Sequence, residues 1–220
     1  MLLAKNSLVE DIVTEISDSV PDWIEISERL RQFNFEQPLE RGVLGGLVGE
    51  LNFRICLETI AKKYQSRIVL DPISEGSSSE NYSFDFKDGK LVVHHKGNGH
   101  RVTEVDELIL ADNLPVLCEV KTGSYKNGAG KKKDESSRGS INALRLERIN
   151  YVTEPLREYF RRECGYIVIL PKDQVNPMSI IQKEFIERNG FMATLNFSRR
   201  EYKYVILSNL SRYFKISTIH

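Results

Sequence analysis

The sequence predicts an α/β protein, with a mixed β-sheet flanked by helices and an N-terminal helical extension. Apolar residues recur at helical spacing through the first quarter of the chain, as at Leu8, Ile12 and Ile16. From residue 66 onward the apolar positions instead alternate as they do in β-strands. A further helical pattern and a continuous apolar run then follow, and this order of helix, strands, helix and strand is typical of an α/β fold.

The N-terminal part is expected to be helical throughout. One helix should end at Pro21, and Asp22 can cap a second one. We expect these two helices to form an extension over residues 1–37 and the main domain to span residues 38–220. The main domain should begin with a long helix over residues 38–64.

The remaining elements follow from local patterns. The expected strands lie at residues 66–70, 82–86, 90–95, 102–110, 115–120, 166–170 and 202–207, with turns at residues 87–89 and 111–114. Helices are expected at residues 140–163 and 178–188. The run YIVIL at residues 166–170 is typical of a strand that is covered on both faces.

The composition excludes several classes of protein. With 40% hydrophobic and 28% charged residues, the 220-residue chain can build a core. No apolar run approaches the roughly 18 residues that a membrane-spanning helix needs, so we expect no membrane contact and a cytoplasmic location. The three cysteines lack metal-binding or disulfide spacing and should be buried small hydrophobic residues.

The charge is balanced overall but unevenly distributed. Residues 1–60 hold 5 basic and 11 acidic side chains, whereas residues 121–148 hold 8 basic and 3 acidic ones. A basic segment can bind a polyanion even in a neutral protein, although a solvated surface loop would have the same composition. The expected phosphate contacts are Lys126, Lys131, Lys132, Lys133, Arg138 and Arg145.

The stretch EVDELILADNLPVLCEVKTG, residues 104–123, carries the strongest chemical signal. If the two strands within it pair in antiparallel fashion, Asp106 and Glu119 lie at the same end of the hairpin. Two neighbouring carboxylates repel one another unless a positive group lies between them, and Mg²⁺ prefers oxygen ligands. Lys121 lies two positions beyond Glu119 and therefore on the same face of the strand. Its ammonium group could orient a metal-bound water or stabilise a phosphate.

This arrangement resembles the PD-(D/E)xK nuclease superfamily, which has the restriction-endonuclease-like fold. Asp106 matches the Asp of the motif, and Glu119-Val120-Lys121 matches the acid-x-Lys triplet. Glu50, on the long helix upstream, matches the glutamate that such a helix often adds. The context VLCEVKTG is especially similar to the Holliday-junction resolvase and Mrr-type branches.

The resemblance implies a metal-dependent endonuclease acting on DNA with Mg²⁺ or Mn²⁺. It implies that Asp106, Glu119 and the Val120 carbonyl bind the metal, that Glu50 contributes directly or through water, and that Lys121 assists the attacking water. Because cutting two strands calls for two sites, it also implies a homodimer.

Two other functions remain open at this level. The domain could be a catalytically inactive nuclease-like module for nucleic-acid binding or assembly. It could also be an unrelated α/β interaction protein with its acidic N-terminal helices as the partner face. Within the nuclease hypothesis, Glu104 and Glu107 should point away from Asp106 as surface charges.

Overall fold

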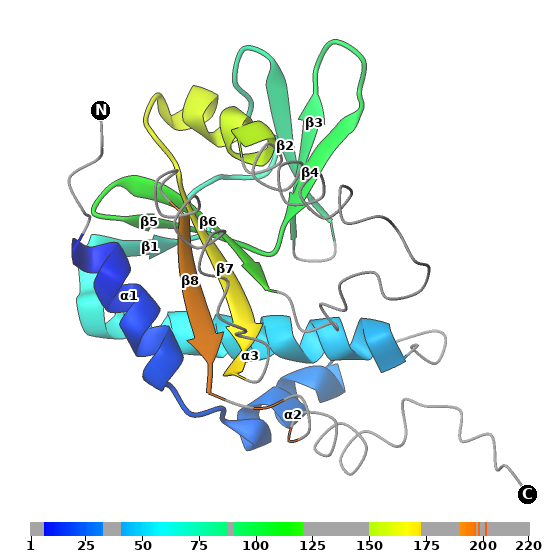
Figure 1. Ribbon diagram of the computed structural model, residues 1–220. Coiled ribbons are helices and arrows are strands. Elements are labelled where there is room, and N and C mark those ends of the chain that lie inside the picture. The colour runs from blue at the N-terminus through cyan, green and yellow to red at the C-terminus, as the bar shows by residue number, and fades with distance from the viewer. Residues whose placement is uncertain are drawn as a thin grey trace, which may run out of the picture.

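The computed structural model describes residues 7–32, 41–87, 90–120, 150–172 and 190–196, together with residues 198 and 201. Its centre is a five-stranded mixed sheet in the order β1-β5-β6-β7-β8 (Figure 1). The strands are β1 (Ile68–Leu70), β5 (Glu107–Ala111), β6 (Leu114–Val120), β7 (Gly165–Pro171) and β8 (Gly190–Leu195). The β1-β5-β6 part is antiparallel, whereas β7 is parallel to both β6 and β8. The predicted α/β class with a mixed sheet is confirmed.

A second, smaller sheet is inserted between β1 and β5. Its antiparallel strands are β2 (Tyr82–Lys87), β3 (Lys90–His95) and β4 (Arg101–Val105), and they project at the top of Figure 1. The strand expected over residues 102–110 is therefore two strands. Asp106 forms a bend between β4 in the small sheet and β5 in the large one.

Three helices precede the sheets: α1 (Ser7–Asp18), α2 (Trp23–Gln32) and α3 (Arg41–Tyr64), the last followed by the short 3-10 helix η1 (Gln65–Arg67). Asp22 caps α2 as expected, because its Oδ1 accepts hydrogen bonds of 3.0 Å from the backbone N–H groups of Ile24 and Glu25. Among the described residues, no helix is both long and apolar enough to cross a membrane.

One face of the large sheet is covered by α1, α2 and α3. Leu8 and Ile12 of α1, Leu30 of α2 and Phe53 of α3 share one hydrophobic core with sheet residues such as Ile169. The two N-terminal helices therefore pack as part of the main core. The boundary predicted at residues 37 and 38 lies outside the described residues.

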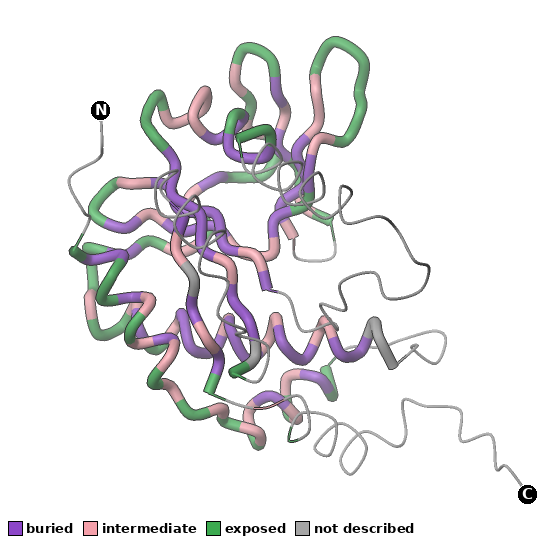
Figure 2. Tube along the Cα trace, in the orientation of Figure 1, coloured by how far each residue is buried: buried purple, intermediate pink, exposed green. Residues whose placement is uncertain are grey.

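The opposite face carries a second core. Val152 and Leu156, from a helical segment at residues 150–160, pack with Phe84 of the small sheet and with Leu117 and Tyr166 of the large one. Figure 2 shows the resulting pattern, in which buried positions concentrate on the central strands and on the inner sides of the helices. Of the helix predicted over residues 140–163, residues 150–160 are helical, whereas residues 161–163 lie beyond its end.

The C-terminal predictions are mostly beyond the described part of the chain. The helix at residues 178–188 and the strand at residues 202–207 both lie outside it. Strand β8 was not predicted, because GFMATL has little alternation; it pairs with β7 over its whole length. All three cysteines are buried free thiols, as expected.

Candidate functional site

Asp106 occupies the bend where the small sheet meets the large one. The register of β5 with β6 begins at the pair Glu107 and Cys118, so Asp106 lies level with the end of β6. Its Oδ2 accepts a hydrogen bond of 2.9 Å from the backbone N–H of Val120, and its side chain is only 13% exposed. The predicted convergence of Asp106 with the end of the next strand is thus present.

Glu119 projects from β6 toward the second core rather than toward α3. Alternation explains this direction, because Cys118 and Val120 on either side of it belong to the core beneath the helices. The hydroxyl of Tyr166, on the neighbouring strand β7, donates a hydrogen bond to Oε2 of Glu119. Glu119 and Asp106 line the same small hollow, which Tyr166 and Thr103 also border.

Glu50 and Asp106 both contact the ammonium group of one lysine, Lys90. The Nζ of Lys90, at the start of β3, lies 2.8 Å from Oε1 of Glu50 and 3.1 Å from Oδ1 of Asp106. A third carboxylate, that of Glu104, has its Oε1 3.5 Å from the same Nζ. Side chains from α3, β3, β4 and the Asp106 bend therefore meet around one ammonium group. The expectation that Glu104 points away from Asp106 is wrong, because residues two positions apart in an extended segment lie on the same face.

The electrostatics of this cluster follow from its partial burial. Burial raises the pKa of Glu50, and the negative charges of Asp106 and Glu104 add to the rise, while the hydrogen bond from Lys90 opposes it. For Lys90, burial alone would lower the pKa, but the hydrogen bond to Glu50 and the charge of Asp106 outweigh it. The pKa of Lys90 therefore lies above its ordinary value, and the side chain is a fixed positive charge.

Lys90 was missed by sequence reasoning. It follows the turn predicted at residues 87–89 and has the sequence context of an ordinary strand-end lysine. Its role depends on the pairing of β3 with β4 and on the position of α3, neither of which leaves a local signal.

Glu107 corrects a second expectation. It was expected to point away from Asp106 as a surface charge, but only 11% of its side chain is exposed, and it lines a hollow together with Asp106. Nη1 of Arg54, on α3, lies 2.7 Å from its Oε2. Burial is the main cause that raises the pKa of Glu107 to about 7, against the lowering effect of Arg54.

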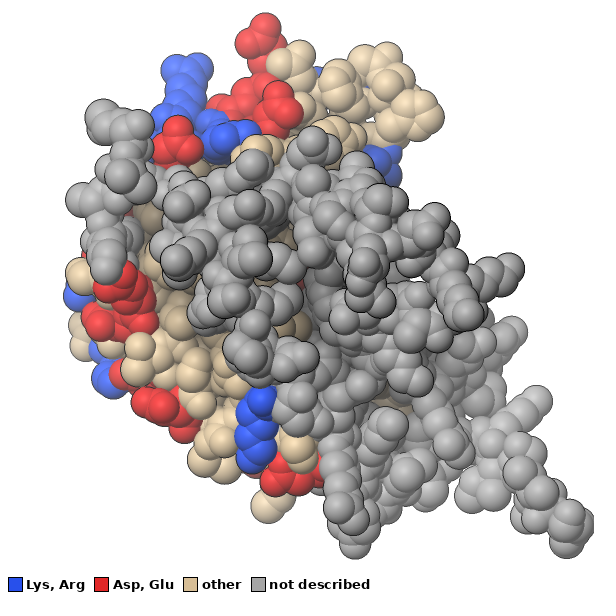
Figure 3. Space-filling view, in the orientation of Figure 1, with Lys and Arg blue, Asp and Glu red and all other residues tan. Residues whose placement is uncertain are grey.

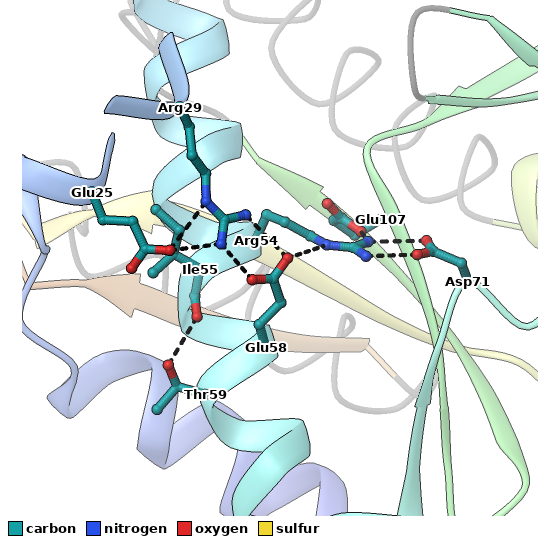
Figure 4. A network of polar contacts seen from close by, with 8 residues as sticks. All are labelled: Glu25, Arg29, Arg54, Ile55, Glu58, Thr59, Asp71 and Glu107. Atoms are coloured by element: carbon teal, nitrogen blue, oxygen red, sulfur yellow. Dashed lines mark hydrogen bonds and ion pairs between the residues drawn. The ribbon is translucent and has the colours of Figure 1, made fainter. Parts of the chain in front are cut away.

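Arg54 is the centre of an ion-pair network on the helix side of the sheet (Figure 4). Its guanidinium also pairs with Asp71, at 2.6 Å, and with Glu58, at 3.1 Å. Arg29 of α2 pairs with Glu58 at 2.6 Å and with a further carboxylate, that of Glu25. The network connects α2 to the strand that begins directly after Asp106.

Seven basic residues of the prediction follow β6 in the sequence. All seven lie outside the described residues: Lys121 and the expected phosphate contacts Lys126, Lys131, Lys132, Lys133, Arg138 and Arg145. On the face seen in Figure 3, acidic and basic side chains of the described residues are intermingled. The basic segment stays a prediction from the sequence.

The carboxylate oxygens of this cluster are the type of ligand that Mg²⁺ and Mn²⁺ prefer. Within the described part of the chain, however, no group of three His, Cys, Asp or Glu side chains is placed to hold a metal ion. In this arrangement Nζ of Lys90 lies between Glu50 and Asp106.

Comparison of the chain with protein-family models, with curated proteins and with solved structures finds no match in any of the three. The function must therefore be argued from the site itself.

Proposed function

We propose that this chain is a metal-dependent nuclease that hydrolyses phosphodiester bonds in DNA. The observation that carries the proposal is the hydrogen bond from Val120 N–H to Asp106. It brings an aspartate at the start of one strand against the end of the next, where Glu119-Val120-Lys121 stands in the sequence. This is the arrangement that the D…ExK motif requires.

The order of elements supports the same proposal. The helix α3, which carries Glu50, precedes three antiparallel strands of the large sheet, and β7 then runs parallel to the strand that carries Glu119. Glu50 and Asp106, far apart in the sequence, share the ammonium group of Lys90. A helical acid and a strand acid are therefore within reach of one cation.

Each side chain has a specific role in this proposal. Asp106, Glu119, the Val120 carbonyl and Glu50 would hold one or two Mg²⁺ or Mn²⁺ ions, which supply charge stabilisation and an activated water when bound. The Val120 amide fixes the orientation of Asp106, and the Tyr166 hydroxyl fixes that of Glu119. Lys121 would orient the attacking water or neutralise the scissile phosphate.

The test is cleavage of supercoiled, linear, branched and single-stranded DNA with Mg²⁺, with Mn²⁺ and with chelator. We expect cleavage that requires the metal and falls at least about a hundredfold in Asp106→Asn and in Lys121→Met. Asp85→Asn, which removes an exposed carboxylate from β2, is the matched control and should retain activity. Cleavage that persists in both Asp106→Ala and Lys121→Ala would rule out this mechanism.

One observation favours a second candidate, an inactive nuclease-like module that binds nucleic acid or assembles with a partner. Lys90 already neutralises two of the acids that a metal would need. For such a module we expect salt-sensitive DNA binding in gel shifts, because basic residues displace counterions from phosphates. Cleavage would then be absent with every divalent metal tried.

A further inference from the structure

A single lysine ammonium occupies the place where the carboxylates of the candidate site converge. Oxygens of Glu50, Asp106 and Glu104 lie 2.8, 3.1 and 3.5 Å from Nζ of Lys90. The Lys90 side chain is 24% exposed and that of Asp106 is 13% exposed, so solvent screens their charges only in part. Without a cation these three acids would repel one another across a partly buried space.

The same space cannot hold Lys90 and a divalent ion together. A divalent ion takes carboxylate oxygens at about 2.0–2.6 Å, closer than any of the three lysine contacts. It would also bring two positive charges to within a few ångströms of the ammonium group. Binding of an ion by Glu50 and Asp106 therefore requires that Lys90 leaves.

We propose that Lys90 is a built-in competitor of the divalent cation, holding Glu50 and Asp106 together in the metal-free protein and releasing them when the ion binds. This inference rests on the proposed function, since it assumes that these two acids bind the metal. Lys90 is the first residue of β3, so its side chain can swing outward while the strand stays paired with β2 and β4. The released ammonium would then stand at the rim of the site as an added positive charge for a phosphate.

Removing the ammonium should strengthen metal binding. We expect Lys90→Gln to bind Mn²⁺ about tenfold or more tightly than the wild type in calorimetric titration, because its amide can still donate to a carboxylate but carries no charge. The control is Lys96→Gln, which removes a lysine of the same hairpin whose Nζ donates to the backbone carbonyl of Ser79. Its Mn²⁺ affinity should equal that of the wild type.

A second measurement needs no variant and therefore does not depend on whether Lys90→Gln folds. Brief acetylation of the wild-type protein, read by mass spectrometry, should label Lys90 several-fold more when saturating Mg²⁺ is present. Lys96 in the same sample is the internal standard and should not change. A rise confined to Lys90 supports the competition.

The contrary outcomes separate this inference from the proposed function. Wild type and Lys90→Gln that bind Mn²⁺ equally well, with Lys90 labelling unaffected by the ion, would overturn the competition and leave the nuclease proposal standing. Weaker binding by Lys90→Gln would also overturn it, since Lys90 would then support the metal site. If neither protein binds Mn²⁺ and the wild type cuts no DNA, both proposals fail.

Discussion

Asp106 and Val120 are joined by a hydrogen bond of 2.9 Å, from the backbone N–H of Val120 to Oδ2 of the aspartate. The other carboxylate oxygen, Oδ1, faces Nζ of Lys90. One side chain therefore connects the end of β6 in the large sheet with the start of β3 in the small one. Because both of its oxygens have partners, Asp106 is fixed in direction before any ligand arrives.

This bond predicts a local change in amide exchange. Asp106→Ala removes a charged acceptor, a loss of about 1.5–3 kcal/mol for such a bond, so hydrogen exchange at the Val120 amide should accelerate at least about tenfold. Asp106→Asn keeps an acceptor oxygen and should exchange more slowly than the alanine variant. Asp85→Ala is the control. Equal exchange at Val120 in Asp106→Ala and the wild type would show that the bond does not hold this strand end.

Tyr166 should be a positioning residue for Glu119. Tyr166→Phe removes the hydroxyl that donates to the Glu119 carboxylate, and we expect kcat for DNA cleavage to fall about tenfold with little change in KM. Tyr159→Phe is the matched control, because its hydroxyl makes only a 3.4 Å contact with Ser77. If Tyr166 had only a structural role, Tyr166→Phe would lower the free energy of unfolding in urea and leave kcat unchanged.

Arg54 should matter for stability more than an exposed arginine does. Arg54→Met leaves Glu107 buried without its ion-pair partner, which should lower the free energy of unfolding by about 2 kcal/mol. Arg67→Met breaks only the exposed pair with Asp112 and should leave the urea midpoint nearly unchanged. Equal midpoints for the two variants would contradict a special role for the network.

Glu107 predicts a pH dependence of stability. Its pKa is about 7 in the folded protein, against an ordinary value of 4.5, so the folded state binds the extra proton between these two pH values. Stability from this group is therefore present at low pH and is lost as the pH rises toward 7, by about 3 kcal/mol at most.

Glu107→Gln removes this titration. The free energy of unfolding of the variant, minus that of the wild type, should rise by about 2–3 kcal/mol between pH 4.5 and pH 8 in urea titrations. A difference that stays constant over this range would mean that the carboxylate ionises equally easily in the folded and unfolded chains.

The sequence was informative where a local pattern decides the outcome. Alternation placed the strands of the β5–β6 hairpin, and the short turn at residues 111–114 set their register, so Asp106 and Glu119 could be expected at the same end. The cap at Asp22 and the helix that carries Glu50 likewise follow from short-range signals.

The break at Asp106 and the surroundings of Lys90 and Glu107 depend on tertiary contacts, which leave no local pattern in the sequence. The break at Asp106 involves a single residue, and the apolar residues on both sides of it are also typical of one continuous strand. Lys90 and Glu107 are charged residues in strands, where exposure is the usual outcome. The packing of α3 against the sheet makes Lys90 the centre of the acid cluster, and it makes Glu107 a buried partner of Arg54.

The parallel pairing of β6 with β7 has a consequence for how the molecule is made. The small sheet and the β5–β6 hairpin close through short connections, whereas β7 can join β6 only after the whole chain between Val120 and Gly165 has been synthesised. Since Glu119 takes its hydroxyl partner from β7, we expect the nascent chain to acquire a fully oriented acid pair late, near the end of its folding.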